Sequence, residues 1–270
     1  MKRKTVIFLS GGLGNNLFQI AYGEYLNQNG YHVCYNTYLT QKNIVTKFLG
    51  WSIHKNEITS KLLMSKTKSD KLNVIDIIFL AYTLFKKKIK HDNLYSTPEV
   101  PTERYFGYAA QGNHLNKKIF SILANKINMI FHEKISKEKK GTVLHIRRGD
   151  FSKDCSLADE YYINSLEKMK IKDEVIIVTD TPKIMGHVKK YISENARLSN
   201  GKSMLDDFFV ILNAEKVIMS NSTYCYWACI LGNVRQVTFP NRISKNKNWF
   251  FSLNEIPSQK ITCRFLSEME

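Results

Sequence analysis

Two adjacent arginines, Arg147 and Arg148, are the residues of this chain whose type and spacing point most directly to chemistry. A guanidinium stays charged at any working pH, and its planar fork pairs bidentately with phosphate oxygens, so two of them at one place suit a diphosphate. His145 precedes them, and Asp150 follows closely enough to orient one of them. These residues alone leave a second interpretation open, in which an Arg–Asp network only caps the edge of a sheet.

The segment before the arginines has the pattern of a buried strand. Thr142–Ile146 is rich in β-branched residues, and side chains alternate along a strand, so His145 and Arg147 would share one face. The strand delivers these side chains to its carboxyl end, which is where open α/β sheets bind their ligands. Gly149 then allows the chain to turn.

A glycine-rich turn near the N-terminus has the layout of a phosphate cradle. Thr5–Leu9 reads as a strand, Ser10–Asn15 contains three glycines, and a helix is expected from Asn16 to near Gly30. Glycines let the backbone approach a ligand closely, and a helix N-terminus presents free N–H groups. The dinucleotide fingerprint fails, because Leu17 stands where its third glycine is expected. Ligand binding and a plain tight turn therefore both remain open.

A third segment repeats this layout in the C-terminal half. Lys216–Met219 reads as a strand, Ser220-Asn221-Ser222-Thr223 follows, and a helix is expected from Ser222 to Leu231. The simpler interpretation is a Ser/Thr helix cap, worth about 1 kcal/mol of stability. Two such helix starts together with an Arg-Arg strand end are harder to explain by capping alone.

The chain as a whole predicts two α/β domains. Glu133–Gly141 is dense in lysine and glutamate, which predicts a boundary there and domains at 1–135 and 136–270. After it, strands alternate with helices of about ten residues, which is typical of a parallel sheet. The other expected elements are strands at Tyr31–Tyr35 and Glu174–Val178, a strand in Tyr105–Tyr108 that leads into a loop, and helices at Ile58–Leu63, Val74–Phe85, Leu115–His132, Asp159–Met169 and Leu205–Asn213.

The charge is strongly positive. Lys plus Arg number 40 against 24 Asp plus Glu, a net charge of +16, which favours an anionic partner: nucleic acid, an acidic membrane or a phosphorylated substrate. The basic residues form short clusters such as Lys86–Lys88 and Lys137–Lys140, which favours a generally positive surface over a nucleic-acid-binding arm. The apolar run Val74–Phe85 is too short to span a bilayer; a buried helix with a basic end is favoured over one that lies on a membrane.

The cysteines and the N-terminus indicate a cytoplasmic protein. The five cysteines form no Cys-x-x-Cys pair, so they are expected to be reduced, and no histidine cluster completes a zinc set. Met1–Lys4 is basic, but the apolar run after it is short, which makes a poor signal peptide.

Four ordered motifs resemble those of the bacterial α-1,2-fucosyltransferase family. They are Gly11-Gly12-Leu13-Gly14-Asn15-Asn16-Leu17-Phe18-Gln19, Gly107-Tyr108 with Gln111, His145-Ile146-Arg147-Arg148-Gly149-Asp150, and Asn221-Ser222-Thr223 with Trp227-Ala228. The resemblance implies a GT-B fold, with two Rossmann-like domains whose parallel sheets face a central cleft. The first would hold the glycine loop and the acceptor side, and the second would bind GDP-fucose.

The resemblance also assigns roles by position. Arg147 would hold the β-phosphate and the departing oxygen, with Arg148 and Asp150 in support. His145 and Asp207 would contact guanine. Gly12, Gly14, Asn15, Asn221, Ser222 and Thr223 would surround the donor. The departures from the family pattern are Asn16, Thr179-Asp180-Thr181 and Tyr224-Cys225-Tyr226, and the last two bear on the acceptor side.

The implied activity is transfer of L-fucose from GDP-β-L-fucose, with inversion and without a metal, to the 2-hydroxyl of a terminal galactose-type residue. The acceptor would be a bacterial surface-glycan precursor, O-antigen or capsule, and the enzyme cytoplasmic with peripheral contact to the anionic inner membrane. The sequence contains no Asp-x-Asp, so arginines would replace a metal. Candidates for a general base are Asp150, Asp154, Asp159 and Glu160. The alternatives are a same-fold glycosyltransferase with another linkage or sugar nucleotide and, remotely, a nucleic-acid-binding protein.

Overall fold

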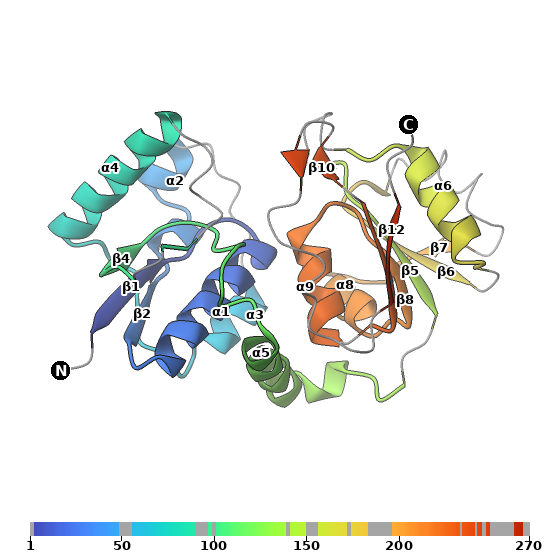
Figure 1. Cartoon of the computed structure of the whole chain (residues 1–270), viewed down its shortest axis with the longest axis horizontal. Coiled ribbons are helices and arrows are strands. Elements are labelled where there is room, and N and C mark those ends of the chain that lie inside the picture. The colour runs from blue at the N-terminus through green and yellow to red at the C-terminus, as the bar shows by residue number, and fades with distance from the viewer. Residues whose placement is uncertain are drawn as a thin grey trace. The chain divides into compact units, whose positions relative to one another are not determined.

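The computed structural model divides the chain into two compact α/β units, each built around a parallel sheet (Figure 1). Unit 1 comprises Met1–Ile130 with Phe250–Glu255, and unit 2 comprises Phe131–Trp249 with Ile256–Glu270, so the division falls five residues before the predicted boundary. The structure describes residues 3–48, 56–89, 97–98, 101–138, 141–149, 156–171, 174–182, 196–232, 234–240, 242–244, 247–248 and 262–266.

Unit 1 is a sheet between two layers of helices. Its strands β1 (Lys4–Phe8), β2 (His32–Asn36), β3 (Lys68–Ser69) and β4 (Arg104–Tyr105) are all parallel and lie in the order β3-β2-β1-β4. Helices α1 (Leu13–Gln28), α3 (Glu57–Leu62) and α5 (Lys117–Ile130) pack together on one face, and α2 (Ile44–Phe48) and α4 (Val74–Ile89) lie on the other (Figure 1). A short 3-10 helix, η1, spans Tyr38–Thr40.

Unit 2 has a larger parallel sheet in the order β12-β9-β8-β5-β6-β7. Its strands are β5 (Thr142–Ile146), β6 (Val175–Thr179), β7 (Ala196–Leu198), β8 (Lys216–Ile218), β9 (Gln236–Pro240) and β12 (Thr262–Leu266). Its helices are η3 (His132–Lys134), α6 (Asp159–Lys168), α8 (Met204–Leu212) and α9 (Thr223–Gly232). A small antiparallel pair joins β10 (Arg242–Ser244) and β11 (Lys247–Asn248).

The strand order fixes where each unit can bind a ligand. In unit 2 the chain runs outward from β5 to β6 and β7, then crosses back to β8 on the other side of β5. In unit 1 it runs from β1 to β2 and β3, then returns to β4 on the other side of β1. Ligands of open α/β sheets bind at the carboxyl ends of the two strands that flank such a switch point. The pairs β5/β8 and β1/β4 therefore mark the two candidate positions.

The predicted α/β fold class, with two Rossmann-like units each built on a parallel sheet, is confirmed. Each helix and strand expected from the sequence and lying within the described residues is present within a few residues of its expected bounds.

The prediction that Val74–Phe85 forms a buried helix is wrong. The segment is helical, but Val74, Ile78 and Phe85 are 72%, 63% and 68% exposed. The physical reason is that unit 1 covers only one face of α4, whereas the apolar residues run all round the helix. No helix in the described part of the chain is long and apolar enough to cross a bilayer.

Candidate functional site in unit 2

His145 lies at the carboxyl end of β5, beside the switch point. The strand is buried along its whole length and pairs with both β6 and β8. The Nδ1 atom of His145 lies 2.7 Å from the hydroxyl of Ser220, the second residue after β8. Burial, and then the positive charge of Arg147, lower the pKa of His145 to about 3. The imidazole is therefore neutral at physiological pH and offers hydrogen bonding rather than charge.

Arg147 extends toward the start of α9. One of its Nη1 hydrogens points to the hydroxyl of Ser222 at 3.4 Å, and Ser222 immediately precedes the first residue of α9. The first turn of α9 contains no acidic residue. A helix N-terminus carries a positive dipole end and free N–H groups, and the guanidinium adds a full positive charge next to them. Together they form a place where an anion, such as a phosphate, would be stabilised.

Arg148 lies elsewhere. Its Nη2 donates to the carbonyl of Leu157 at 3.0 Å and to the carboxylate of Asp159 at the start of α6. Its guanidinium carbon also lies 5.9 Å from the ring centroid of Tyr162 on the same helix. The structure thus places this arginine against α6 rather than beside Ser222, as strand alternation would separate neighbours. Its supporting role in catalysis stays a prediction.

The four candidate general bases lie in different surroundings, and two of them fall outside the described residues. Asp150 and Asp154 lie outside the described residues. Asp159 accepts the hydrogen bond from Arg148, which ties it to a structural contact. Glu160 is exposed on α6. None of these positions identifies a base.

Asp180 is a site residue that sequence reasoning missed. It follows β6, and its two carboxylate oxygens accept from the backbone N–H groups of Arg148 and Gly149, each at 3.0 Å. The side chain therefore fixes the turn that begins directly after Arg147. The sequence signal was available, because Thr179-Asp180-Thr181 follows a predicted strand, but the segment was interpreted as a departure from the family pattern that bears on the acceptor side.

Asp207 and Tyr224 complete the carboxyl edge of this sheet. Asp207 lies in the first turn of α8 and accepts from the hydroxyl of Ser199 at 2.6 Å. Burial raises its pKa, with neighbouring Asp206 adding to the shift and Ser199 opposing it. The ring of Tyr224 lies 6.0 Å from that of His145, and its hydroxyl donates to the carbonyl of Met204 at 2.6 Å. Tyr224 thus links the end of β5 to the first turn of α8.

Asn221 and Thr223 flank Ser222, as the sequence motif requires. Asn221 is buried, and Thr223 is the first residue of α9 and half-buried. Four of the predicted donor-site segments therefore meet around one switch point: the end of β5, the turn after β8, the start of α9 and, through Tyr224, the start of α8. Among the described residues, no group of three or more His, Cys, Asp or Glu side chains converges as a metal site would.

Candidate functional site in unit 1

The glycine loop lies at the carboxyl end of β1 and opens α1. Gly11 has φ +77°, a left-handed conformation that favours glycine, so the turn itself accounts for it. Gly12 has φ −77° and ψ −177°, which any residue adopts, and within the described residues no atom beyond its neighbours lies within 4 Å of where a Cβ would stand. Gly12 therefore has no folding reason to be glycine, which favours close approach of a ligand. Gly14 is buried in α1, and Asn15 is half-buried beside Gly11.

Gln19 holds this loop in place, a role that sequence reasoning did not assign to it. The side chain is fully buried, accepts from the backbone N–H of Ser10 at 3.1 Å and donates to the carbonyl of Gly107 at 2.6 Å. Ser10 follows β1 and Gly107 follows β4, so one amide joins both sides of the switch point of unit 1. Asn16 supports it by donating to the carbonyl of Ser10 at 3.0 Å.

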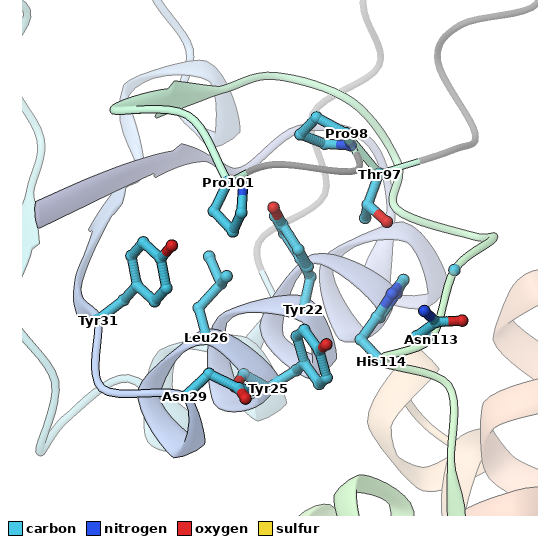
Figure 2. A pocket seen from close by; sticks show the side chains of 11 residues that line it. Tyr22, Tyr25, Leu26, Asn29, Tyr31, Thr97, Pro98, Pro101, Asn113 and His114 are labelled. Carbon is cyan, nitrogen blue, oxygen red and sulfur yellow. The ribbon is translucent and has the colours of Figure 1, made fainter. Parts of the chain in front are cut away.

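An aromatic pocket of about 380 Å³ lies beside α1 (Figure 2). Figure 2 shows the rings of Tyr22, Tyr25 and Tyr31 facing it together with His114. Burial lowers the pKa of His114 to about 4, and its Nε2 lies 2.7 Å from the carbonyl of Ala109. A carbonyl only accepts, so Nε2 of the neutral ring carries the proton. Apolar walls with a few polar groups are typical of small-molecule sites of this size.

Family and similar structures

Residues 38–250 match the family model for glycosyl transferase family 11. The chain belongs to this family, which is an α-fucosyltransferase family. The resemblance drawn from the four motifs is thereby confirmed. No curated protein matches the family 11 chain.

Several solved glycosyltransferases are similar to the family 11 chain at low identity. Fucosyltransferase NodZ from Bradyrhizobium is 12% identical, with 86% of this chain and 94% of that chain covered and a TM-score of 0.46. Heptosyltransferase WaaC from E. coli, with ADP-2-deoxy-2-fluoro heptose, is 10% identical, with coverages of 97% and 92% and a TM-score of 0.48. A family 9 glycosyl transferase from Veillonella parvula is 12% identical, with coverages of 98% and 86% and a TM-score of 0.45. These scores lie below 0.5, so none of these likenesses assigns an activity to this chain.

Proposed function

We propose that this family 11 enzyme transfers L-fucose from GDP-β-L-fucose to the 2-hydroxyl of a terminal galactose-type residue on a bacterial surface-glycan precursor, with inversion and without a metal ion. The observation that carries the proposal is the guanidinium of Arg147 at the N-terminus of α9, next to neutral His145 at the switch point of unit 2. Family membership supports the fucosyl group, and the acceptor and linkage follow the motif resemblance.

The chemistry of the proposed transfer asks for positive hydrogen-bond donors at the leaving group. As the glycosidic bond breaks, the sugar becomes oxocarbenium-like and negative charge grows on the β-phosphate. Donors placed where that charge develops lower the barrier, because they interact more strongly with the transition state than with the bound substrate. Arg147 and the positive dipole end at the start of α9 would fill this role.

The other residues of the site would position the nucleotide. A neutral His145 can hydrogen-bond a base without adding charge, and a carboxylate at Asp207 would accept from both N1–H and the exocyclic amine of guanine. Asp180 would fix the position of Arg147, because its carboxylate binds the two backbone N–H groups of the turn that follows Arg147. These assignments predict that GDP binds with residues of unit 2 even when no acceptor is present.

The test is release of GDP from GDP-fucose in the presence of EDTA, with and without lactose or another β-galactoside, for the wild type and Arg147→Ala. We expect acceptor-stimulated release that EDTA does not reduce, and a loss of about 10²-fold or more in the variant, the size found when one stabilising donor is removed. Arg235→Ala is the matched control. Arg235 is exposed and precedes β9, so it lies at the amino edge of the sheet, opposite the site.

Three results would contradict the proposal. A strict Mn²⁺ requirement would refute metal independence, and equal activity of Arg147→Ala and Arg235→Ala would refute the role of Arg147. Absence of GDP binding in calorimetry would refute the donor.

Competition by GDP-mannose or UDP-galactose at equal strength would favour a glycosyltransferase with another donor, and product linkage analysis would separate a 2-hydroxyl from another hydroxyl. A steep salt-dependent shift of oligonucleotides would instead favour nucleic-acid binding.

A further inference from the structure

Helix α4 presents a wide apolar face to solvent. The exposed side chains between Val74 and Phe85 are all apolar or aromatic, and they cover an arc of about 160° around the helix axis at 100° per residue. Between Val74 and Phe85, no charged residue lies on this arc. Its members and their exposed fractions are Val74 72%, Ile75 59%, Ile77 53%, Ile78 63%, Tyr82 57% and Phe85 68%, with exposed Ala81 between them.

The opposite face of α4 is anchored in unit 1, so the orientation of the helix is set by contacts. Asp76 is buried and forms an ion pair with Arg104 of β4 at 2.9 Å. The ring of Phe79 stacks on that of Phe8 in β1, with centroids 5.7 Å apart, and Leu80 is 4% exposed in the same cluster. The apolar arc therefore faces away from the unit because the other side of the helix is firmly held.

Helix α2 also carries exposed apolar side chains. Val45 of α2 packs in the cluster that holds the inner face of α4, and Figure 1 shows the two helices on the same side of the sheet. Its outer side chains Ile44 and Phe48 are 86% and 88% exposed. Exposed apolar surface as wide as the arc of α4 marks an interaction site on a folded protein. We call the exposed arc of α4 together with Ile44 and Phe48 the apolar ledge.

We infer that the apolar ledge docks on the surface of an anionic lipid bilayer, with α4 lying in the plane of the headgroups. The sequence continues from the ledge directly into Lys86-Lys87-Lys88, and exposed Lys47 lies between Ile44 and Phe48. An apolar helix face bordered by lysines is the pattern of an interfacial helix, which gains from apolar burial and from attraction to anionic lipid.

The net charge of the chain and the length of α4 favour a lipid bilayer over other partners for the ledge. Two copies of a chain of net charge +16, joined through faces bordered by lysines, would bring like charges together. At about 1.5 Å per residue, the 16 residues of α4 measure about 24 Å, shorter than the roughly 30 Å hydrocarbon core, so α4 fits on a bilayer rather than across it. The inference does not rest on the proposed transferase activity.

The test is co-sedimentation of the full chain with vesicles of phosphatidylcholine alone and of phosphatidylcholine with phosphatidylglycerol. We expect binding to the anionic vesicles only, and a fall of about tenfold or more in bound protein for the triple variant Ile75→Ser/Ile78→Ser/Phe85→Ser, since apolar burial contributes directly to interfacial binding. Met129→Ser is the matched control, because Met129 is an apolar residue of α5 that is 77% exposed and lies outside the ledge.

Several outcomes would overturn the inference. They are no binding of the wild type to anionic vesicles, equal binding of the triple variant, or equal loss in Met129→Ser. Sedimentation velocity of the proteins without vesicles tests whether a second copy of the chain binds the ledge instead. A wild-type dimer that is absent in the triple variant would mean that it does. Circular dichroism and the urea midpoint of the triple variant should match those of the wild type, and GDP release with a water-dissolved β-galactoside should be unchanged.

Discussion

Replacing Gln19 should loosen the glycine loop of unit 1 by a calculable amount. In Gln19→Met the shape is largely kept, but the backbone N–H of Ser10 and the carbonyl of Gly107 lose the side-chain partners they have at 3.1 Å and 2.6 Å. A buried polar group left without its partner costs about 1–3 kcal/mol, so the two together predict a loss of about 2–6 kcal/mol. That is a large part of the 5–15 kcal/mol typical of a domain.

Urea unfolding measures this loss. The chain has two units, which can unfold in separate transitions. Far-UV circular dichroism and a fluorescence probe should therefore be followed together. Gln28→Met is the control, because Gln28 is the exposed last residue of the same helix and should change stability by less than about 0.5 kcal/mol.

A second variant separates hydrogen bonding from shape. Gln19→Glu keeps an acceptor for Ser10 but places a carboxylate oxygen against the carbonyl of Gly107 at neutral pH, so it should destabilise at least as much as Gln19→Met. If both variants unfold at the wild-type urea concentration, the amide does not join the two sides of the switch point, and the reasoning fails.

Three further predictions concern the two sites. Asp180→Asn retains one acceptor but turns an NH₂ group toward a backbone N–H, so kcat of GDP release should fall by about tenfold, and unchanged kinetics would refute a positioning role. Gly12→Ala should leave the urea midpoint unchanged yet lower kcat/KM if a ligand approaches that backbone, whereas Gly23→Ala, whose Cβ would lie 2.1 Å from a buried tyrosine hydroxyl, should destabilise unit 1. The lowered pKa values of His145 (about 3) and His114 (about 4) mean that only the unfolded chain takes up protons as pH falls below about 6.5. Stability should therefore fall by about 2 kcal/mol per histidine between about pH 7 and pH 5, as urea titrations would measure, and variants lacking the imidazole should lose that dependence.

The sequence predicted those parts of the fold in which local pattern and tertiary structure agree. The β-branched run Thr142–Ile146 became the central strand of unit 2, and strand alternation correctly placed His145 and Arg147 near one another, beside Ser220 and Ser222. The short strands β3 and β7 have two and three residues and exist only through pairing with distant segments. Strands this short have no local periodicity from which they could be predicted.

The contacts that the sequence did not predict have the same origin. Arg148 reads like Arg147 in the sequence, yet a carboxylate on α6 binds it, and nothing near Arg148 in the chain specifies that contact. Likewise the apolar residues around α4 specify a helix but not how many of its faces the rest of the unit will cover, and unit 1 covers one. Side-chain direction and the extent of coverage are properties of long-range packing, which a single sequence does not encode in its spacing.

The two units repeat one topology but differ in charge at their switch points, and this difference bears on the proposed division of roles. In each unit a strand ends, a short polar turn follows, and a helix begins. Unit 2 adds a guanidinium at this place, whereas the loop of unit 1 is built from Ser10, glycines and the amides of Asn16 and Gln19. A diphosphate with growing negative charge needs a positive partner, and a neutral hydroxyl-bearing sugar does not. The charge at Arg147 therefore supports unit 2 as the holder of the leaving group, and it makes Arg147→Ala the variant that most directly separates the proposed transferase from a protein that only shares its fold.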